Sequence, residues 1–325
     1  SVVRLHQCAK MVRMKFGLPG IKLFRQLGFF LNQAALGGSA ALEGVMMKAA
    51  DAWALAVRLP NGQIHVERHE EEALTKKYPW ARLPLIRGVV ALWDAMSISY
   101  KSLSRSAELA GEEDEKVSGA AMYGTLAVSL VIALALFVWL PARLAGLLVD
   151  EERFRFLFYV VAGLFETAIL IGYLVFIGRM KDMQRFFMYH GAEHKAIAAH
   201  EKGLELTVEN VRAQPAYHPR CGTSFIAFTA VVGVFVYSFF PPLTVAWYWI
   251  FPRLLMIPVV AAVSFEVLRY SAAHHDPFSR FFRWLGFKFQ MLTVREPTDD
   301  MIEVAIESTK AALAQQPAEK PVAVA

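Results

Sequence analysis

Four long apolar segments dominate the chain after residue 118. They cover residues 119–140, 156–178, 222–240 and 254–273. The first has no charged residue, the second has only Glu166, and the fourth contains Glu266 and Arg269. Because about 20 apolar residues in a helix cross the hydrocarbon core of a bilayer, this pattern predicts four transmembrane helices.

The region before residue 119 follows a different pattern. Residues 52–59 and 63–68 alternate apolar and polar positions around Pro60-Asn61-Gly62, which indicates a β-hairpin. Residues 83–96 are apolar but too short to span a bilayer, so they are expected to form a re-entrant or surface helix. Residues 36–47 are too rich in glycine to predict a helix. The sequence therefore predicts a small α+β portion ahead of the transmembrane helices.

Amphipathic patterns flank these segments. Residues 1–30 are basic and mildly amphipathic, which fits either a helix on anionic lipid or a poorly ordered leader. Residues 281–292 stay apolar and aromatic, as expected of a segment that lies along the membrane interface. Thr298 and the two aspartates after it predict the start of an amphipathic helix over 301–313, and the tail from Gln315 is expected to be disordered.

These patterns together predict a mainly α-helical, polytopic membrane protein in three parts. Residues 1–118 form a cytosolic region with a hairpin and interfacial helices. Residues 119–273 form a four-helix transmembrane region with a cytosolic, His-rich loop at 179–221. Residues 274–325 form a C-terminal cytosolic segment.

Composition agrees with a membrane protein. Hydrophobic residues make up 56% of the 325 residues and the mean hydropathy is +0.37, values typical of an integral membrane protein. The two cysteines, Cys8 and Cys221, have no spacing that suggests a disulfide framework. A reducing, cytosol-facing environment is therefore expected.

The distribution of basic residues sets the orientation. Of the 34 Lys and Arg residues, all but four precede residue 119, lie in the loop 179–221, or follow residue 268. Positive charge favours the cytoplasmic side, so both termini and the His-rich loop of a multi-pass protein of the inner (cytoplasmic) membrane are expected in the cytoplasm. Topology thus accounts for the net charge of +5, and nucleic acid is not expected as a partner. The expected partner is the lipid bilayer, with contact to anionic lipid, and the sequence does not identify a protein partner.

Two histidines four residues apart mark the His-rich loop. In Tyr189-His190-Gly191-Ala192-Glu193-His194-Lys195 they would share one face of a helix, a spacing that suits two ligands of one divalent metal. The order H-x-x-E-H is that of the inverted zincins, in which the glutamate is the general base. The sequence therefore predicts His190 and His194 as ligands of zinc or another divalent metal, and Glu193 as a catalytic residue.

The third protein ligand has two candidates. His218 and Cys221 are spaced H-x-x-C, as in a tight turn after the histidine pair. Glu266 is expected near the cytoplasmic end of the last transmembrane helix, at the depth where the histidine helix emerges. Glu266 with both histidines would leave a metal position open, as in a catalytic zinc site. His218 and Cys221 with both histidines would instead fill four positions, as in a structural site.

These alternatives lead to different functions. An open site favours a zinc-dependent hydrolase at the cytoplasmic membrane surface, acting on peptide or lipid-like substrates. A closed site, or a hydrogen-bonded His and Cys cluster, favours a membrane scaffold or partner-binding protein. Glu166, a carboxylate deep in an apolar segment, suggests a third function, an ion- or proton-coupled transporter. The lack of an internal repeat weakens the transporter hypothesis.

Longer blocks carry a resemblance to a known family. The chain is similar to the bacterial YqhQ-like membrane family over roughly residues 36–306. The matching blocks are Gly37-Gly38, Glu43-Gly44-Val45-Met46-Met47, residues 85–92, Tyr189 to Lys195, residues 206–212, residues 218–225, Ser264-Phe265-Glu266 and residues 292–297.

The departures from the family pattern are small. The family tends to have Gln where Ser39 stands. It also tends to have a further Cys or His near Ala198 and Ala199, which is absent here, so no metal ligand is expected from that stretch. The resemblance implies a membrane protein of unknown function that is a proposed metal-dependent enzyme. It supplies no substrate.

Overall fold

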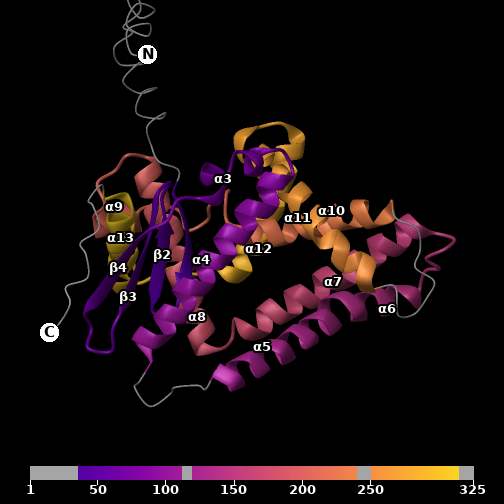
Figure 1. The fold of residues 1–325 in the computed structure, drawn as a ribbon, viewed down its shortest axis with the longest axis horizontal. Coiled ribbons are helices and arrows are strands. Elements are labelled where there is room, and N and C mark those ends of the chain that lie inside the picture. Colours follow the sequence, from indigo (N-terminus) through magenta and orange to yellow (C-terminus); the bar gives the residue numbers. More distant parts are fainter. Residues whose placement is uncertain (1–35, 112–118, 240–249, 315–325) are drawn as a thin grey trace, which may run out of the picture. The chain divides into compact units, whose positions relative to one another are not determined.

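A four-stranded antiparallel sheet begins the described chain, which comprises residues 36–111, 119–239 and 250–314 of this computed structural model (Figure 1). Its strands β1 (Gly37–Ala41), β2 (Gly44–Lys48), β3 (Ala52–Arg58) and β4 (Ile64–Glu70) pair in sequence order. The predicted hairpin is formed by β3 and β4. The glycine-rich segment that predicted no helix supplies β1 and β2, so the sheet is twice the size of the predicted hairpin.

The helices carry most of the remaining described chain. In chain order they are α3 (Leu74–Lys77), the 3-10 turn η1 (Pro79–Arg82), α4 (Ile86–Ala110), α5 (Gly119–Leu134), the π-helical segment η2 (Ala135–Trp139), α6 (Leu140–Gly146), α7 (Arg155–Ile177), α8 (Lys181–Glu201), α9 (Val208–Arg212), α10 (Gly222–Ser238), α11 (Ile250–Ala273), α12 (Pro277–Thr293) and α13 (Asp299–Leu313).

Helices cover both faces of the sheet. On one face, alternate β3 residues Trp53, Leu55 and Val57 pack with Ile98 of α4 in a buried cluster. On the other face Gly38 of β1 lies against the Glu193 side chain of α8, because a Cβ added there would meet Glu193 Cγ at 2.9 Å. α13 contacts α8, β2 and β3. The sheet therefore forms the middle layer, and one of its neighbours is the helix that carries the histidine motif.

α4 differs from the short re-entrant or surface helix predicted from residues 83–96. It has 25 residues and continues to Ala110. Its buried stripe repeats every four residues, at Asp94, Ile98, Ser102 and Ser106, which is the spacing of one helix face. The small serines on this stripe let α4 lie close to the sheet, where the Leu42 backbone N–H donates to Ser106 Oγ at 3.1 Å.

Three helical stretches in the described part of the chain are long and apolar enough to cross a membrane. They are residues 127–146, Arg155–Ile177 and Leu255–Ala273. The remaining predicted transmembrane segment forms α10, an apolar helix of 17 residues that is shorter than these three. The structure thus supports three candidate spans where the sequence predicted four.

The first of these stretches passes through Pro141, where the sequence predicted its end. Proline lacks an N–H donor and its ring clashes with the carbonyl four residues earlier, so a regular α-helix cannot continue through it unchanged. Here the five-residue π-helical segment η2 precedes Pro141 and widens the turn, and α6 then continues to Gly146. The local change in hydrogen bonding accommodates the proline without ending the helical stretch.

α10 packs against three other helices of the apolar part. It contacts α7, α11 and α12. On the α12 side, Phe228 forms a buried cluster with Phe282 and Phe289. Cys221 is the N-cap of α10, so its position is fixed by a helix that packs against three others. Predictions for residues 1–30 and for the tail after Ala314 lie outside the described residues.

Candidate metal centre

α8 presents both predicted histidines from a buried helix face. α7 ends at Ile177 and α8 begins at Lys181, so the histidines belong to a separate helix rather than to a continuation of the second apolar segment. Every residue from 191 to 199 is buried. Gly191 is required by packing, since a Cβ there would overlap the backbone oxygen of Arg295. The close approach of this later segment fixes the position of α8.

Backbone carbonyls orient both imidazoles. The Nδ1 of His190 lies 2.9 Å from the oxygen of Thr293, and the Nδ1 of His194 lies 2.6 Å from the oxygen of Ala216. Because a carbonyl oxygen only accepts hydrogen bonds, each Nδ1 must carry the proton. The Nε2 lone pairs of the neutral rings are then free to bind a metal, the arrangement that metal-ligating histidines commonly have.

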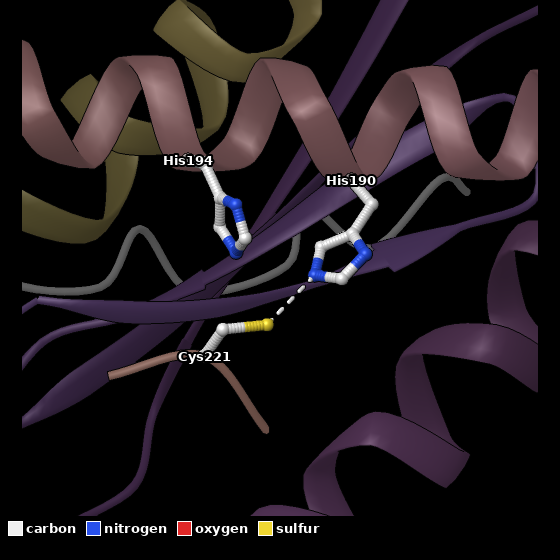
Figure 2. A group of neighbouring side chains, drawn as sticks. All are labelled: His190, His194 and Cys221. Carbon is white, nitrogen blue, oxygen red and sulfur yellow. Dashed lines mark hydrogen bonds between the residues drawn. The ribbon is translucent and has the colours of Figure 1, made fainter. Parts of the chain in front are cut away.

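Cys221 completes a group of three ligand atoms. Its Sγ lies 3.3 Å from the Nε2 of His190, and the Nε2 atoms and the Sγ all lie within 4.8 Å of one another. Figure 2 shows both imidazoles projecting from the same side of α8 toward this cysteine. As the N-cap of α10, Cys221 also accepts a hydrogen bond from the Thr223 N–H at 3.4 Å. Residues 31 positions apart in sequence thereby converge on one point.

The donor set fits a zinc ion. Zinc binds imidazole nitrogen and cysteine sulfur at about 2.0–2.3 Å, so the ligand atoms of a tetrahedral site lie about 3.3–3.8 Å apart. A small contraction of the present group would reach that spacing. The His194 Nε2 is buried and has no hydrogen-bond partner of normal geometry among the described residues, although Cys221 interacts with this ring electrostatically. A buried nitrogen lone pair without a partner is costly unless it is ligated.

Glu193 lies beside this group, and in the described part of the chain one oxygen of its buried carboxyl group also lacks a hydrogen-bond partner. Its Oε2 is 4.0 Å from the Nε2 of His190 and has no hydrogen-bond partner within the described residues. Burial raises the pKa of the Glu193 carboxyl above its ordinary value. A buried carboxylate with a raised pKa next to three ligand atoms has the properties of a proton acceptor.

His218 lies next to the three-atom group and is not part of it. Its ring centroid is 5.9 Å from that of His194, but its Nε2 is 3.2 Å from Oε2 of Glu201. The backbone of His218 exchanges two hydrogen bonds with the Gln290 side chain, at 2.9 and 2.8 Å. Burial lowers the pKa of His218. Of the predicted His218 and Cys221 pair, the structure brings the cysteine to the histidines and holds His218 beside them.

Glu266 is not in this group of ligand atoms. Its Oε1 and Oε2 accept from the Arg87 guanidinium at 2.7 and 2.5 Å, and the backbone N–H of Leu85 lies 3.5 Å from Oε1. Both carboxylate oxygens are therefore occupied by α4 and the turn before it. The expected position of Glu266 near the cytoplasmic end of its helix is therefore not enough to make it a ligand, because its partner is a cation 179 residues away.

Several residues that shape the site carry no chemical signal in the sequence. Thr293 and Ala216 act through backbone oxygens, which any residue could supply. Gln290 and Lys195 act through buried side chains: the Lys195 amine donates to the backbone oxygens of Arg212 and Gln214 at 2.9 and 2.7 Å. Of these, only Lys195 lies within the motif, where a lysine buried next to a ligand could have signalled a structural role.

Fold and site together define a class of protein. It is a mainly helical protein with a four-stranded sheet, three helices apolar enough to cross a membrane, and a buried His, His and Cys cluster. The profile of the protein family described as "Protein of unknown function (DUF1385)" matches residues 83–315, and the chain belongs to this family. All three cluster residues lie within the matched segment.

A curated relative agrees with this assignment. The chain is 36% identical over 291 residues to a Bacillus subtilis (strain 168) protein named "Uncharacterized protein YqhQ", covering 84% of this chain and 91% of the relative. The resemblance to the YqhQ-like family is thereby confirmed. No solved structure matches the chain.

Proposed function

We propose that this protein is a zinc-dependent hydrolase at the membrane surface. The observation that carries the proposal is the convergence of ligand atoms of His190, His194 and Cys221, all within 4.8 Å, beside Glu193, whose Oε2 has no hydrogen-bond partner among the described residues. Three protein ligands leave a fourth position for water or substrate, which is the arrangement of catalytic zinc sites.

Each residue of the site would have a distinct role. His190, His194 and Cys221 would hold the metal, which supplies Lewis-acid chemistry for activating water and polarising a carbonyl. Glu193 would take a proton from the attacking water and pass it to the leaving group, a task that its raised pKa suits. The carbonyl oxygens of Thr293 and Ala216 keep both imidazoles in the metal-binding tautomer.

The apolar helices support the proposed location and the kind of substrate. The apolar stretches expose large side chains, with Val131, Leu164 and Phe176 each 66% exposed, which supports a lipid surrounding. We infer a bacterial inner membrane with the centre on the cytoplasmic side, because the charged residues Arg179, Lys181 and Arg185 lie between the second apolar stretch and the histidines. Peptides or lipids at that surface are the substrates within reach.

A conservative change at Glu193 tests the proposal. Purified wild type and Glu193→Gln in lipid nanodiscs would be assayed with a fluorogenic lipid ester and a fluorogenic peptide, and their zinc content measured by mass spectrometry. We expect the variant to keep its zinc and to lose activity by about 100-fold or more, because a general base contributes about 10²–10⁴-fold. Equal turnover by both proteins, or no turnover above buffer by zinc-loaded wild type on either substrate class, contradicts the hydrolase.

Burial of the cluster favours a second function. Cys221 is 5% and His194 is 1% exposed, as in a structural metal site. In that case the metal would clamp α8 to the N-terminus of α10 in a membrane scaffold or partner-binding protein. Zinc removal would then lower the unfolding temperature strongly, while Glu193→Gln would leave both zinc and stability unchanged.

A further inference from the structure

A separate apolar cavity lies among the helices. Its volume is about 330 Å³, and it is lined by residues of α4, η2, α6, α7, α10 and α11. None of the three cluster residues lines it. The volume falls within the range of small-molecule sites, which are mostly apolar with few polar groups that fix the orientation of a ligand.

One carboxylate faces this apolar lining. Glu166 of α7 is the single ionisable acid or base among the lining residues apart from two tyrosines. No hydrogen bond or ion pair of the Glu166 side chain is found within the described parts of the chain. A carboxylate in such surroundings is costly unless a positive charge or a proton compensates it, and a bound cation would supply that positive charge.

Aromatic rings surround the same space. Phe137 of η2, Tyr159 of α7, and Phe225 and Tyr237 of α10 all line the cavity. The rings of Tyr159 and Tyr237 stack with centroids 5.9 Å apart, and the Tyr159 hydroxyl donates to Glu151 at 2.7 Å, so the tyrosines are held in place. Aromatic faces attract cations, and rings combined with a carboxylate recognise ammonium groups.

We propose that this cavity binds an organic cation of the alkylammonium class. The positive nitrogen lies beside Glu166 and the apolar substituents contact the rings. A metal cation is a poor occupant, because calcium and magnesium require about six or more oxygen ligands and the lining supplies few. An uncharged acyl chain would leave the carboxylate uncompensated. The inference does not depend on the metal centre or on hydrolase activity.

Binding of a defined probe tests it. The full chain in nanodiscs of neutral lipid is titrated with radiolabelled benzyltriethylammonium, a quaternary ammonium ion with apolar substituents. We expect saturable binding of about one probe per chain, weakened by about tenfold or more in Glu166→Gln, because the neutral amide removes the charge and keeps the shape. Glu152→Gln is the matched control, since it removes one carboxylate from an exposed position before α7 and should bind as wild type does.

Two further measurements keep the test decisive. If Glu166→Gln does not fold, Phe225→Leu removes one ring while retaining an apolar side chain, and the same weakening is expected with a smaller factor of about three to ten. An uncharged probe of the same shape should compete poorly. The proposal is overturned by unsaturable binding to wild type, by equal affinity in wild type and the folded Glu166 variant, or by equal competition from the uncharged probe.

Discussion

The sheet layer and the apolar helices place their hydrophobic side chains in opposite directions. Leu55 and Val57 of β3 are 1% and 0% exposed, because α4, α8 and α13 cover the sheet. Leu164 and Phe176 of α7, with the same chemistry, are each 66% exposed. Large apolar side chains face inward where water is the solvent and outward where lipid is, so the proposed membrane location of α7 would account for this difference. The two histidines of the cluster lie on α8, which packs on the sheet, whereas Cys221 lies at the N-terminus of α10.

The largest expected effect concerns the proposed metal centre on α8, the histidine helix that packs on the sheet. His194→Ala removes one of three convergent ligands, so bound zinc should fall from about one ion per chain to near zero. His275→Ala, an exposed histidine before α12, is the matched control and should retain the metal. Mass spectrometry of the purified proteins gives the ratio. Retention of zinc by His194→Ala would remove this histidine from the ligand set.

A truncation in each region tests the difference in solvent directly. Leu55→Ala opens a cavity between β3 and α4 and should lower the free energy of unfolding by about 2–5 kcal/mol. Leu164→Ala removes the same atoms from an outward position and should cost less than about 1 kcal/mol. Pulse proteolysis in nanodiscs measures both. Similar losses in the two variants would mean that α7 packs against protein at Leu164, contrary to the comparison.

Substitution of one helical glycine in each region compares the packing of α8 and α7, with a smaller expected effect. Gly191→Ala forces α8 away from the backbone of Arg295 and should destabilise the protein by about 1–3 kcal/mol, with a parallel loss of zinc affinity. A Cβ at Gly172 of α7 meets no atom within 4 Å, so Gly172→Ala should be neutral or slightly stabilising. Thermal unfolding with and without zinc distinguishes the pair. An unchanged Gly191→Ala protein would show that the contact with Arg295 is loose.

The smallest effect is expected at the edge strand of the sheet. Hydrogen bonds from Arg105, the largest cause, lower the pKa of Glu67 to about 2 from an ordinary 4.5. The folded state thus binds the proton less readily than the unfolded state, so the stabilisation is present above pH 4.5 and is lost as the pH falls toward 2. Solvent screening limits it to about 1 kcal/mol.

The variant Glu67→Gln should reduce this acid dependence, whereas Glu70→Gln, at an exposed position on the same strand, should preserve it. Unfolding followed between pH 2 and 6 compares the two. An acid transition of equal size in wild type and Glu67→Gln would assign the pH dependence to other carboxylates.

Local patterns predicted the parts of the site that are close in sequence. The i and i+4 spacing of His190 and His194 needs only a helix. Cys221 belonged to one of two candidate sets for the third ligand, and it lies 31 positions from His190, so tertiary packing decides that it joins the histidines. Glu266 was placed by depth alone, and its partner Arg87 could not be inferred because tertiary packing decides which distant charges meet. The strands β1 and β2 were missed for a related reason, since pairing between strands stabilises glycine-rich segments that have weak local preferences.

The contact between His190 and Thr293 also has a consequence for biosynthesis. The two residues are 103 positions apart, so a ribosome that adds about 5–20 residues per second makes α8 roughly 5–20 s before the carbonyl that orients its imidazole. α13, which covers α8 and the sheet, emerges later still. During that interval the histidine helix has neither its orienting carbonyl nor its cover. The centre is therefore one of the last parts of the nascent chain to form, and a metal ion would enter it only when translation is nearly finished.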